Sequence, residues 1–439
     1  MKSKISTIFK SFLHNESIGG VLLLICAVLS LIFANVPAFG HLHEFWHQTA
    51  SINVANFSLE MSIGHWINDG LMAVFFFVVG LEIKREMLVG ELSSLKQASL
   101  PIFAAVGGMI LPAVIFTLFN HSYSENVNGW AIPMATDIAF AIGVISLLGK
   151  RVPLGLKVFL TALAIVDDLG AIIVLAIFYP SHALHLEMLI YAAAVVAFLV
   201  VLNRNKVHNI MLYIIPGIIL WYFVYKSGVH ATIAGVVLAL TIPAKTTINE
   251  VRFYVGIKSL IEKFKESGNS EVEVLANGEQ QHIIHEIDTK VEEINPLMHK
   301  FEAALHPWVT WLIMPLFALA NAGVILSEEI LTFPPQTVAV GIFFGLFVGK
   351  PLGIFLFSWI AVKSKIAELP IGVNWIQVLA LGVIAGIGFT MSIFINSLAF
   401  DNIEIINVGK VAILATSFVA AIVGLLMIRF TSPLSKGNK

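Results

Sequence analysis

Long apolar segments separated by short polar ones make up most of this 439-residue chain. A helix that crosses a bilayer needs about 20 mostly apolar residues. Twelve segments approach or exceed this length, at about 15–35, 64–83, 98–119, 128–149, 153–179, 185–202, 210–225, 228–243, 303–326, 336–360, 374–399 and 405–430. We therefore predict an all-α polytopic membrane protein with twelve transmembrane helices, eight within residues 1–244 and four within residues 301–439.

Residues 51–62, SINVANFSLEMS, lie between the first two apolar segments and alternate apolar and polar positions around a central Ala-Asn. This pattern predicts a small extracytoplasmic β-hairpin. Because an isolated hairpin is only marginally stable in water, we expect it to pair with its copy in a second subunit. The predicted assembly is a homodimer held through this hairpin.

Residues 245–300 form the one long polar segment of the chain. This segment mixes acidic and basic residues and contains Ser-Gly-Asn and Asn-Gly turn signals. We predict a solvated cytoplasmic insertion that is partly helical. A regulatory domain is the alternative interpretation of the same segment.

The composition agrees with a membrane protein and excludes several other classes. Hydrophobic residues make up 58% of the chain and charged residues 12%, whereas a soluble protein has about 25% charged residues. Cys26 is the only cysteine, which excludes an internal disulfide and a cysteine-based metal cluster. The formal net charge of −2 shows no basic bias, so no nucleic-acid partner is expected.

The basic residues indicate how the helices are oriented, because Lys and Arg collect on the cytoplasmic side of bacterial membrane proteins. With the N-terminus in the cytoplasm and twelve alternating spans, all basic residues except Lys226, Lys350 and Lys410 fall on the cytoplasmic side. We therefore predict that both termini are cytoplasmic. Lys350 is the one basic residue that this assignment leaves in the interior of a predicted span, away from both ends.

Two adjacent aspartates, Asp167 and Asp168, lie in the middle of the apolar run FLTALAIVDDLGAIIVLAIFY. One charge at that depth costs at least about 2.5 kcal/mol, and two neighbouring carboxylates also repel each other. We expect the pair to exchange protons near physiological pH and a small cation to compete for the same oxygens. Lys350 needs an acidic partner. We favour Asp167 for the lysine and Asp168 for the ion, although the two side chains project about 100° apart and the spacing alone does not decide.

Two of the predicted spans contain helix breakers. The fourth reads WAIPMATDIAFAIGV, in which Pro133 is followed within one turn by Thr136 and Asp137, and the eleventh, ALGVIAGIGFTMSIF, has three glycines followed by hydroxyl side chains. Non-helical backbone at membrane depth survives only where it is buried in protein or lines a cavity. For either span alone, a kink or a small-residue packing face is the alternative.

The two interrupted spans occupy equivalent places in the predicted topology. Each is the middle helix of a set of three, the third to fifth and the tenth to twelfth, and the two sets are inverted relative to each other. Such paired interruptions are typical of a transport site near mid-membrane. The four half-helix ends would carry partial charges of about 0.5 e each, which Asp137 and Lys350 are suited to offset.

Five segments together resemble the NhaA family of sodium/proton antiporters: NDGLMAVFFFVVGLEIKRE, IPMATDIAFAIGV, LTALAIVDDLGAI, LFVGKPLGI and IAGIGFTMSIF. The resemblance covers nearly all twelve predicted spans and departs at residues 245–300, which are longer than the corresponding loop of the best-known members. This family is itself one of the examples on which the association between interrupted helices and transport sites rests.

The resemblance implies a core domain and an interface domain, with inverted three-helix repeats and two interrupted helices that cross at mid-membrane. It implies that Asp167 and Asp168 bind Na⁺ or Li⁺ and protons, that Lys350 is the partner of Asp167, and that Asp137 and Thr136 lie at the crossing. The positions associated with pH sensing are Glu82, Arg85, Glu86, His230 and Glu302. Ordinary helix-end charges are the alternative for Glu82, Arg85 and Glu86, and a structural histidine is the alternative for His230.

The predicted function is electrogenic Na⁺(Li⁺)/H⁺ antiport by alternating access in a bacterial inner membrane, with pH regulation and, from the resemblance, two protons per Na⁺. The expected partners are Na⁺, Li⁺, H⁺, the lipid bilayer and a second subunit, and neither an enzymatic activity nor a cofactor is expected. An intramembrane aspartyl protease would need its carboxylates on different helices, and a channel would need selectivity rings. A sodium-coupled solute symporter is the main alternative.

Overall fold

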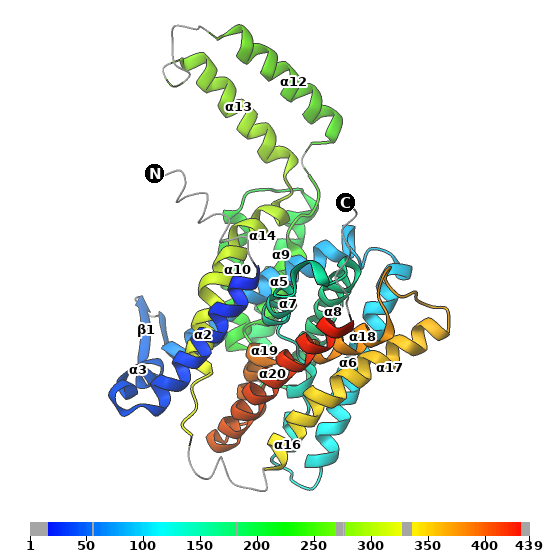
Figure 1. The fold of residues 1–439 in the computed structure, drawn as a ribbon. Coiled ribbons are helices and arrows are strands. Elements are labelled where there is room, and N and C mark those ends of the chain that lie inside the picture. Colours follow the sequence, from blue (N-terminus) through cyan, green and yellow to red (C-terminus); the bar gives the residue numbers. More distant parts are fainter. Residues whose placement is uncertain are drawn as a thin grey trace.

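The computed structural model describes residues 16–54, 57–180, 183–246, 248–268, 275, 277–326 and 336–431, and it is a bundle of long helices (Figure 1). Up to residue 241, the α-helices are α2 (Glu16–Asn35), α3 (Gly40–Glu44), α4 (Ile63–His65), α5 (Met72–Val89), α6 (Leu95–Asn120), α7 (Ile138–Ser146), α8 (Leu154–Phe178), α9 (Leu186–Arg204), α10 (Met211–Lys226) and α11 (Ile233–Thr241). The remaining α-helices are α12 (Glu250–Glu266), α13 (Gly278–Ile294), α14 (Leu297–Trp308), α15 (Met314–Asn321), α16 (Thr337–Phe344), α17 (Lys350–Lys363), α18 (Trp375–Ala385), α19 (Phe389–Ala399) and α20 (Ile403–Thr431).

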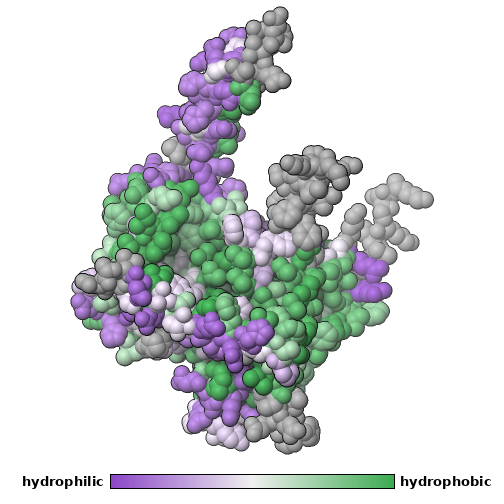
Figure 2. Space-filling view, turned by 90° about the vertical axis from the view of Figure 1, so that its left-hand side faces the viewer, coloured by the Kyte–Doolittle hydropathy of each residue, from purple (hydrophilic) through white to green (hydrophobic). Residues whose placement is uncertain are grey.

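The helices of the bundle are long and apolar enough for a multi-pass membrane protein. Within the described ranges, nine helices could cross a bilayer, and a tenth span is formed if α18 and α19, which are bent by 50° at their junction, are counted together. The helix α10 is apolar but shorter, and α11 is shorter still. Hydrophobic residues cover most of the visible face of the bundle, whereas the protruding α12 and α13 are mostly hydrophilic (Figure 2).

Three of the long spans contain a π-helical turn between two α-helical parts. These turns are Trp66–Leu71 between α4 and α5, Val309–Ile313 between α14 and α15, and Gly345–Gly349 between α16 and α17. A π-helical turn changes the direction in which the following side chains project, and such turns are frequent at functional sites. The third one ends directly before Lys350.

The helices α6 and α17 pack with their backbones in close contact. A Cβ atom on Gly353 would lie 2.1 Å from the carbonyl oxygen of Gly107, and one on Gly107 would lie 2.3 Å from that of Gly353. Small residues at such a crossing let two membrane helices approach closely. This contact fixes the height of α17, and therefore of Lys350, relative to α6.

A two-stranded antiparallel sheet connects the first span to the second. Its strands, β1 (Thr49–Val54) and β2 (Phe57–Ser62), pair from Thr49 with Ser62 to Val54 with Phe57. The segment 51–62, in which the alternating pattern predicts a hairpin, lies within these strands, and the predicted turn at 55–56 lies outside the described residues. The indole Nε1 of Trp66 donates to the carbonyl oxygen of Ala50 at 3.0 Å and ties the sheet to the second span.

The described part of the segment 245–300 includes α12 and α13, which pack against each other and project from one end of the bundle (Figure 1). Asn249 begins α12 by accepting a hydrogen bond from the amide of Arg252, and Asn277 begins α13 in the same way. At the base, the amide of Met298 donates to the carbonyl oxygen of Pro243 at 3.2 Å. The two ends of the segment therefore meet where it joins the bundle.

Candidate functional site

The helix α8 carries Asp167 and Asp168 into the interior of the bundle, where they are only 2% and 1% exposed. Three other segments bring polar groups to the same place. These are α17 with Lys350, the chain between Met134 and α7, and the junction of α18 with α19. The two aspartates share one helix and one environment but differ in their partners.

Asp167 forms a buried ion pair with Lys350. The Nζ atom of Lys350 lies 2.6 Å from Asp167 Oδ2 and also donates to the carbonyl oxygen of Met134. The hydroxyl of Thr136 lies 2.8 Å from the same Oδ2 atom and 2.9 Å from the carbonyl oxygen of Ala385. Because a hydroxyl has one proton, Thr136 can donate to only one of these two acceptors at a time.

Asp168 has a different environment. Neither of its carboxylate oxygens has a hydrogen-bond partner among the described residues, and the same is true of Asp167 Oδ1. The charge of Asp168 interacts with those of Asp167, Lys350, Asp137 and Glu82. A buried oxygen without a donor is unfavourable, so three such oxygens on neighbouring carboxylates form a site suited to a proton or a small cation.

The fourth predicted span is not a continuous α-helix. A 3₁₀-helix ends at Met134, the backbone of Ala135 and Asp137 is extended, and α7 begins at Ile138. Asp137 caps α7, because its Oδ1 accepts a hydrogen bond from the amide of Phe140 at 2.9 Å. Its Oδ2 accepts from both the amide and the hydroxyl of Thr390 at the start of α19. One carboxylate therefore faces the positive ends of two helices.

The junction of α18 and α19 lies against this break. The amide of Asp137 donates to the carbonyl oxygen of Ile387 at 2.8 Å, and the hydroxyl of Ser392 donates to that of Ile132 at 2.8 Å. The amide of Phe389, the first residue of α19, donates to the hydroxyl oxygen of Ser417 on α20 at 3.1 Å. Ser417 is not among the site residues predicted from the sequence, because nothing distinguishes it from other small residues in an apolar span.

Comparison with known proteins identifies the family of this chain. A sequence model of the family described as Na⁺/H⁺ antiporter 1 matches residues 10–428. The chain belongs to this family. The resemblance that was noted from the sequence motifs is thereby confirmed.

Relatives within the Na⁺/H⁺ antiporter 1 family match nearly the whole chain. The Na⁺/H⁺ antiporter NhaA of Oleidesulfovibrio alaskensis is 45% identical over 421 residues, which cover 96% of this chain and 93% of the relative. That of Wolinella succinogenes is 45% identical and covers 96% and 92%. A protein of Helicobacter hepaticus named Na⁺/H⁺ antiporter NhaA 2 is 45% identical and covers 96% and 95%.

Membership in the family decides between some of the alternatives. Members of the Na⁺/H⁺ antiporter 1 family are transporters and not enzymes, which argues against an intramembrane protease. The names of the three relatives also do not favour a solute symporter.

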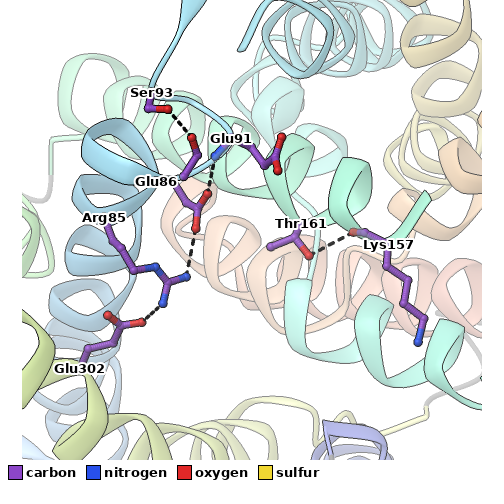
Figure 3. Close-up of polar contacts among 8 residues, drawn as sticks. Arg85, Glu86, Glu91, Ser93, Lys157, Thr161 and Glu302 are labelled. Carbon is purple, nitrogen blue, oxygen red and sulfur yellow. Dashed lines mark hydrogen bonds and ion pairs between the residues drawn. The ribbon is translucent and has the colours of Figure 1, made fainter. Parts of the chain in front are cut away.

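Four of the five residues that the family resemblance associates with pH sensing meet at one end of α5. Arg85 forms ion pairs with Glu302 of α14 and, at 3.1 Å, with Glu86 (Figure 3). The charge of Glu82 interacts with those of Glu302, Arg85 and Glu86, and it also interacts with Asp168. Glu82 is therefore close enough to this cluster and to Asp168 for their charges to interact.

The fifth, His230, is buried just before the N-terminal end of α11. The cluster lies at the other end of that helix, where Lys84 of α5 donates to the carbonyl oxygens of Leu240 and Ile242. The structure therefore does not bring His230 together with the other four. Lys84, which the sequence does not single out, satisfies backbone groups that the end of α11 would leave unpaired.

Proposed function

We propose that this protein is a Na⁺/H⁺ antiporter in which the carboxylates of Asp167 and Asp168 bind Na⁺ and protons in turn. The observation that carries the proposal is the pair of buried carboxylates, of which one is bound to Lys350 and the other has no hydrogen-bond donor within the part of the chain that the structure describes. The names of the relatives give the same two ions, sodium and protons.

The proposed cycle uses one site with alternating access. Facing the cytoplasm, Asp168 releases its proton and, once ionised, accepts Na⁺ with help from Asp167. The bound Na⁺ weakens the pair between Asp167 and Lys350, and Lys350 releases a proton. After the site opens to the outside, Na⁺ leaves and protons bind to Asp168 and to Lys350 or Asp167.

Two protons that enter for each Na⁺ that leaves would move one net positive charge inward per cycle. At 100 mV this charge contributes about 2.3 kcal/mol, which drives Na⁺ export even without a pH gradient. Competition between protons and Na⁺ for the same oxygens would stop transport in acid. The cluster of Glu82, Arg85, Glu86 and Glu302 is proposed to adjust this response, because Glu82 interacts with Asp168.

The proposal includes an arrangement in the membrane. We propose twelve spans, in which the pair α18 and α19 counts as one and the short helices α10 and α11 complete the number. The two interrupted spans would cross at mid-membrane. The protein would lie in a bacterial inner membrane with both termini and the segment 245–300 in the cytoplasm, as a homodimer through β1 and β2.

The test is ion exchange in everted vesicles from a host without its own antiporters. The vesicle interior is acidified and followed with a pH-sensitive dye, and Na⁺, Li⁺ or K⁺ is then added at several pH values. Dye recovery with Na⁺ and Li⁺ but not with K⁺, increasing as the pH rises, is expected. No recovery at any pH, with the protein inserted in the membrane, would overturn antiport and leave solute symport to be tested.

The variant Asp168→Asn tests the site assignment. Because the asparagine amide carries no negative charge and does not titrate at physiological pH, Na⁺-dependent proton movement is expected to be lost. Asp288→Asn is the matched control, since Asp288 is exposed on α13, and it is expected to exchange like the wild type. Normal exchange by Asp168→Asn would show that the ion is bound elsewhere.

A further inference from the structure

The first amide groups of α19 lie deep in the bundle and need acceptors, because the first turn of a helix has no acceptors of its own. Two acceptors from outside the helix are present. Asp137 Oδ2 accepts from the amide of Thr390 at 3.1 Å, and Ser417 Oγ accepts from the amide of Phe389 at 3.1 Å. Ser417 lies on α20, is 3% exposed, and is the only contributor from that helix to this end of α19 among the hydrogen bonds of the described residues.

We propose that Ser417 is a positioning residue for the ion site, which rests on the proposed antiport function. Its hydroxyl oxygen holds the first amide of α19 and thereby fixes the positive end of this helix against Asp137. Asp137 is the neighbour of Thr136, whose hydroxyl lies 2.8 Å from Oδ2 of Asp167, the residue that precedes Asp168. The line of contacts runs from α20 through α19 and the Thr136-Asp137 segment to the pair of carboxylates that we propose binds Na⁺.

Loss of the Ser417 oxygen should change the affinity for Na⁺ in one direction. A helix N-terminus carries about half a positive charge, which is offset here by the Asp137 carboxylate and the Ser417 oxygen. Without the Ser417 oxygen, the amide of Phe389 is left unpaired, or it competes with Thr390 for Asp137. Either result makes the surroundings of Asp168 more positive, so that Na⁺ binds more weakly.

The neighbouring residue provides a matched control. Thr416 is also buried in α20, but its hydroxyl donates to the carbonyl oxygen of Ala412 in the same helix at 2.6 Å. Thr416→Val therefore removes a hydroxyl of the same helix and depth at nearly constant volume, without removing a hydrogen bond to α19. A general effect of polar groups in α20 would appear in both variants.

The experiment measures Na⁺-dependent exchange in vesicles for the wild type, Ser417→Ala, Ser417→Cys and Thr416→Val. For Ser417→Ala we expect the KM for Na⁺ to rise about two- to tenfold, the range that one lost hydrogen bond of ordinary strength produces, with a smaller change in maximal rate. Ser417→Cys keeps the size and offers a weak acceptor, so an intermediate rise is expected. Thr416→Val is expected to keep the wild-type KM.

Several outcomes would overturn the proposal. A wild-type KM in Ser417→Ala would show that the hydroxyl does not act on the site, and a lower maximal rate at unchanged KM would indicate a structural role alone. An equal rise in Thr416→Val would show that α20 responds to any lost hydroxyl. If Ser417→Ala does not insert, Ser417→Cys decides by the same criterion. Absence of exchange in the wild type would instead refute the proposed antiport function.

Discussion

At the scale of single residues, the ion pair of Lys350 and Asp167 is costly because both charges are removed from water. Both side chains are almost completely buried, at 1% and 2% exposure. Taking two charges out of water costs several kcal/mol each, and their attraction compensates only when the geometry is good and other hydrogen bonds complete it. Here Met134 and Thr136 supply those additional hydrogen bonds. Removing one of the two charges should therefore lower the free energy of unfolding more than removing both.

This argument predicts the stability of three variants in detergent. Lys350→Met is expected to lower the free energy of unfolding by about 3–5 kcal/mol, because it leaves the Asp167 carboxylate buried without its counter-charge. Adding Asp167→Asn to Lys350→Met is expected to restore part of that loss. Denaturant unfolding of the two single variants and of the double variant measures the coupling free energy between Lys350 and Asp167.

The exposed ion pair of Lys96 and Glu368 is the control for this cycle. Its side chains are 76% and 79% exposed and its atoms lie 3.0 Å apart. Lys96→Met is expected to change the free energy of unfolding by less than about 1 kcal/mol. If the effects of Lys350→Met and Asp167→Asn were simply additive, the buried pair would not be a coupled unit.

The residues that could be predicted from the sequence are those that stand out energetically from their surroundings. A charge in an apolar span has a large cost, so Asp167, Asp168 and Lys350 are visible without a structure. The pairing of Lys350 with Asp167 rather than Asp168 depends on helix rotation, which adjacent positions leave open. Ser417 and Lys84 could not be predicted, because a serine within a span and a lysine near a helix end are both common.

At the scale of helices, the contact of α6 with α17 determines where Lys350 lies. Gly353 follows Lys350 by one helical turn and meets the backbone of Gly107. In an ordinary helix, alanine is more favourable than glycine by about 0.5–1 kcal/mol. A loss of stability or activity on replacing Gly353 by alanine would therefore come from the contact and not from helix propensity.

Gly353→Ala is expected to separate α6 from α17, since its Cβ would lie 2.1 Å from the carbonyl oxygen of Gly107. Overpacking of this kind costs about 1–3 kcal/mol, and it would draw Lys350 away from Asp167. Exchange activity and the melting temperature should both fall. Gly278→Ala is the control, because an added Cβ there would meet nothing within 4 Å outside its chain neighbours and its own helix backbone, and it should lower neither. Full activity of Gly353→Ala would show that the site tolerates a shift of α17.

The elements differ in how far their sequence determines them. The breaks near Pro133 and before Phe389 could be expected, because proline lacks a backbone donor and glycines weaken a helix. The three π-helical turns could not, since no residue pattern marks them and packing decides where they form. The apolar run 228–243 gives a helix only over Ile233–Thr241, because the positive φ of 85° at Gly228 directs the chain into a turn first.

At the scale of the whole molecule, the helical segment α12–α13 is attached to the bundle by a closed base. Pro243 and Met298 are hydrogen-bonded to each other, and the end of α11 is held by Lys84 of α5 and by Asn203 of α9. The side chains of Leu297 and Met298 belong to the buried core, whereas α12 and α13 pack on each other. The base and the projecting helices should therefore behave differently when they are removed.

Replacing residues 246–294 by a short glycine-serine linker should leave a folded transporter, because the two attachment points already meet and a short loop costs little to close. The KM for Na⁺ is expected to stay within about twofold of the wild type, and the pH profile of exchange is expected to keep its shape, because changes in surface insertions are usually tolerated. A deletion that extends through Met298 is the contrasting variant and should fail to fold, since it removes buried core residues. A changed pH dependence in the shorter deletion would instead identify α12–α13 as a regulatory domain, the alternative that its sequence leaves open.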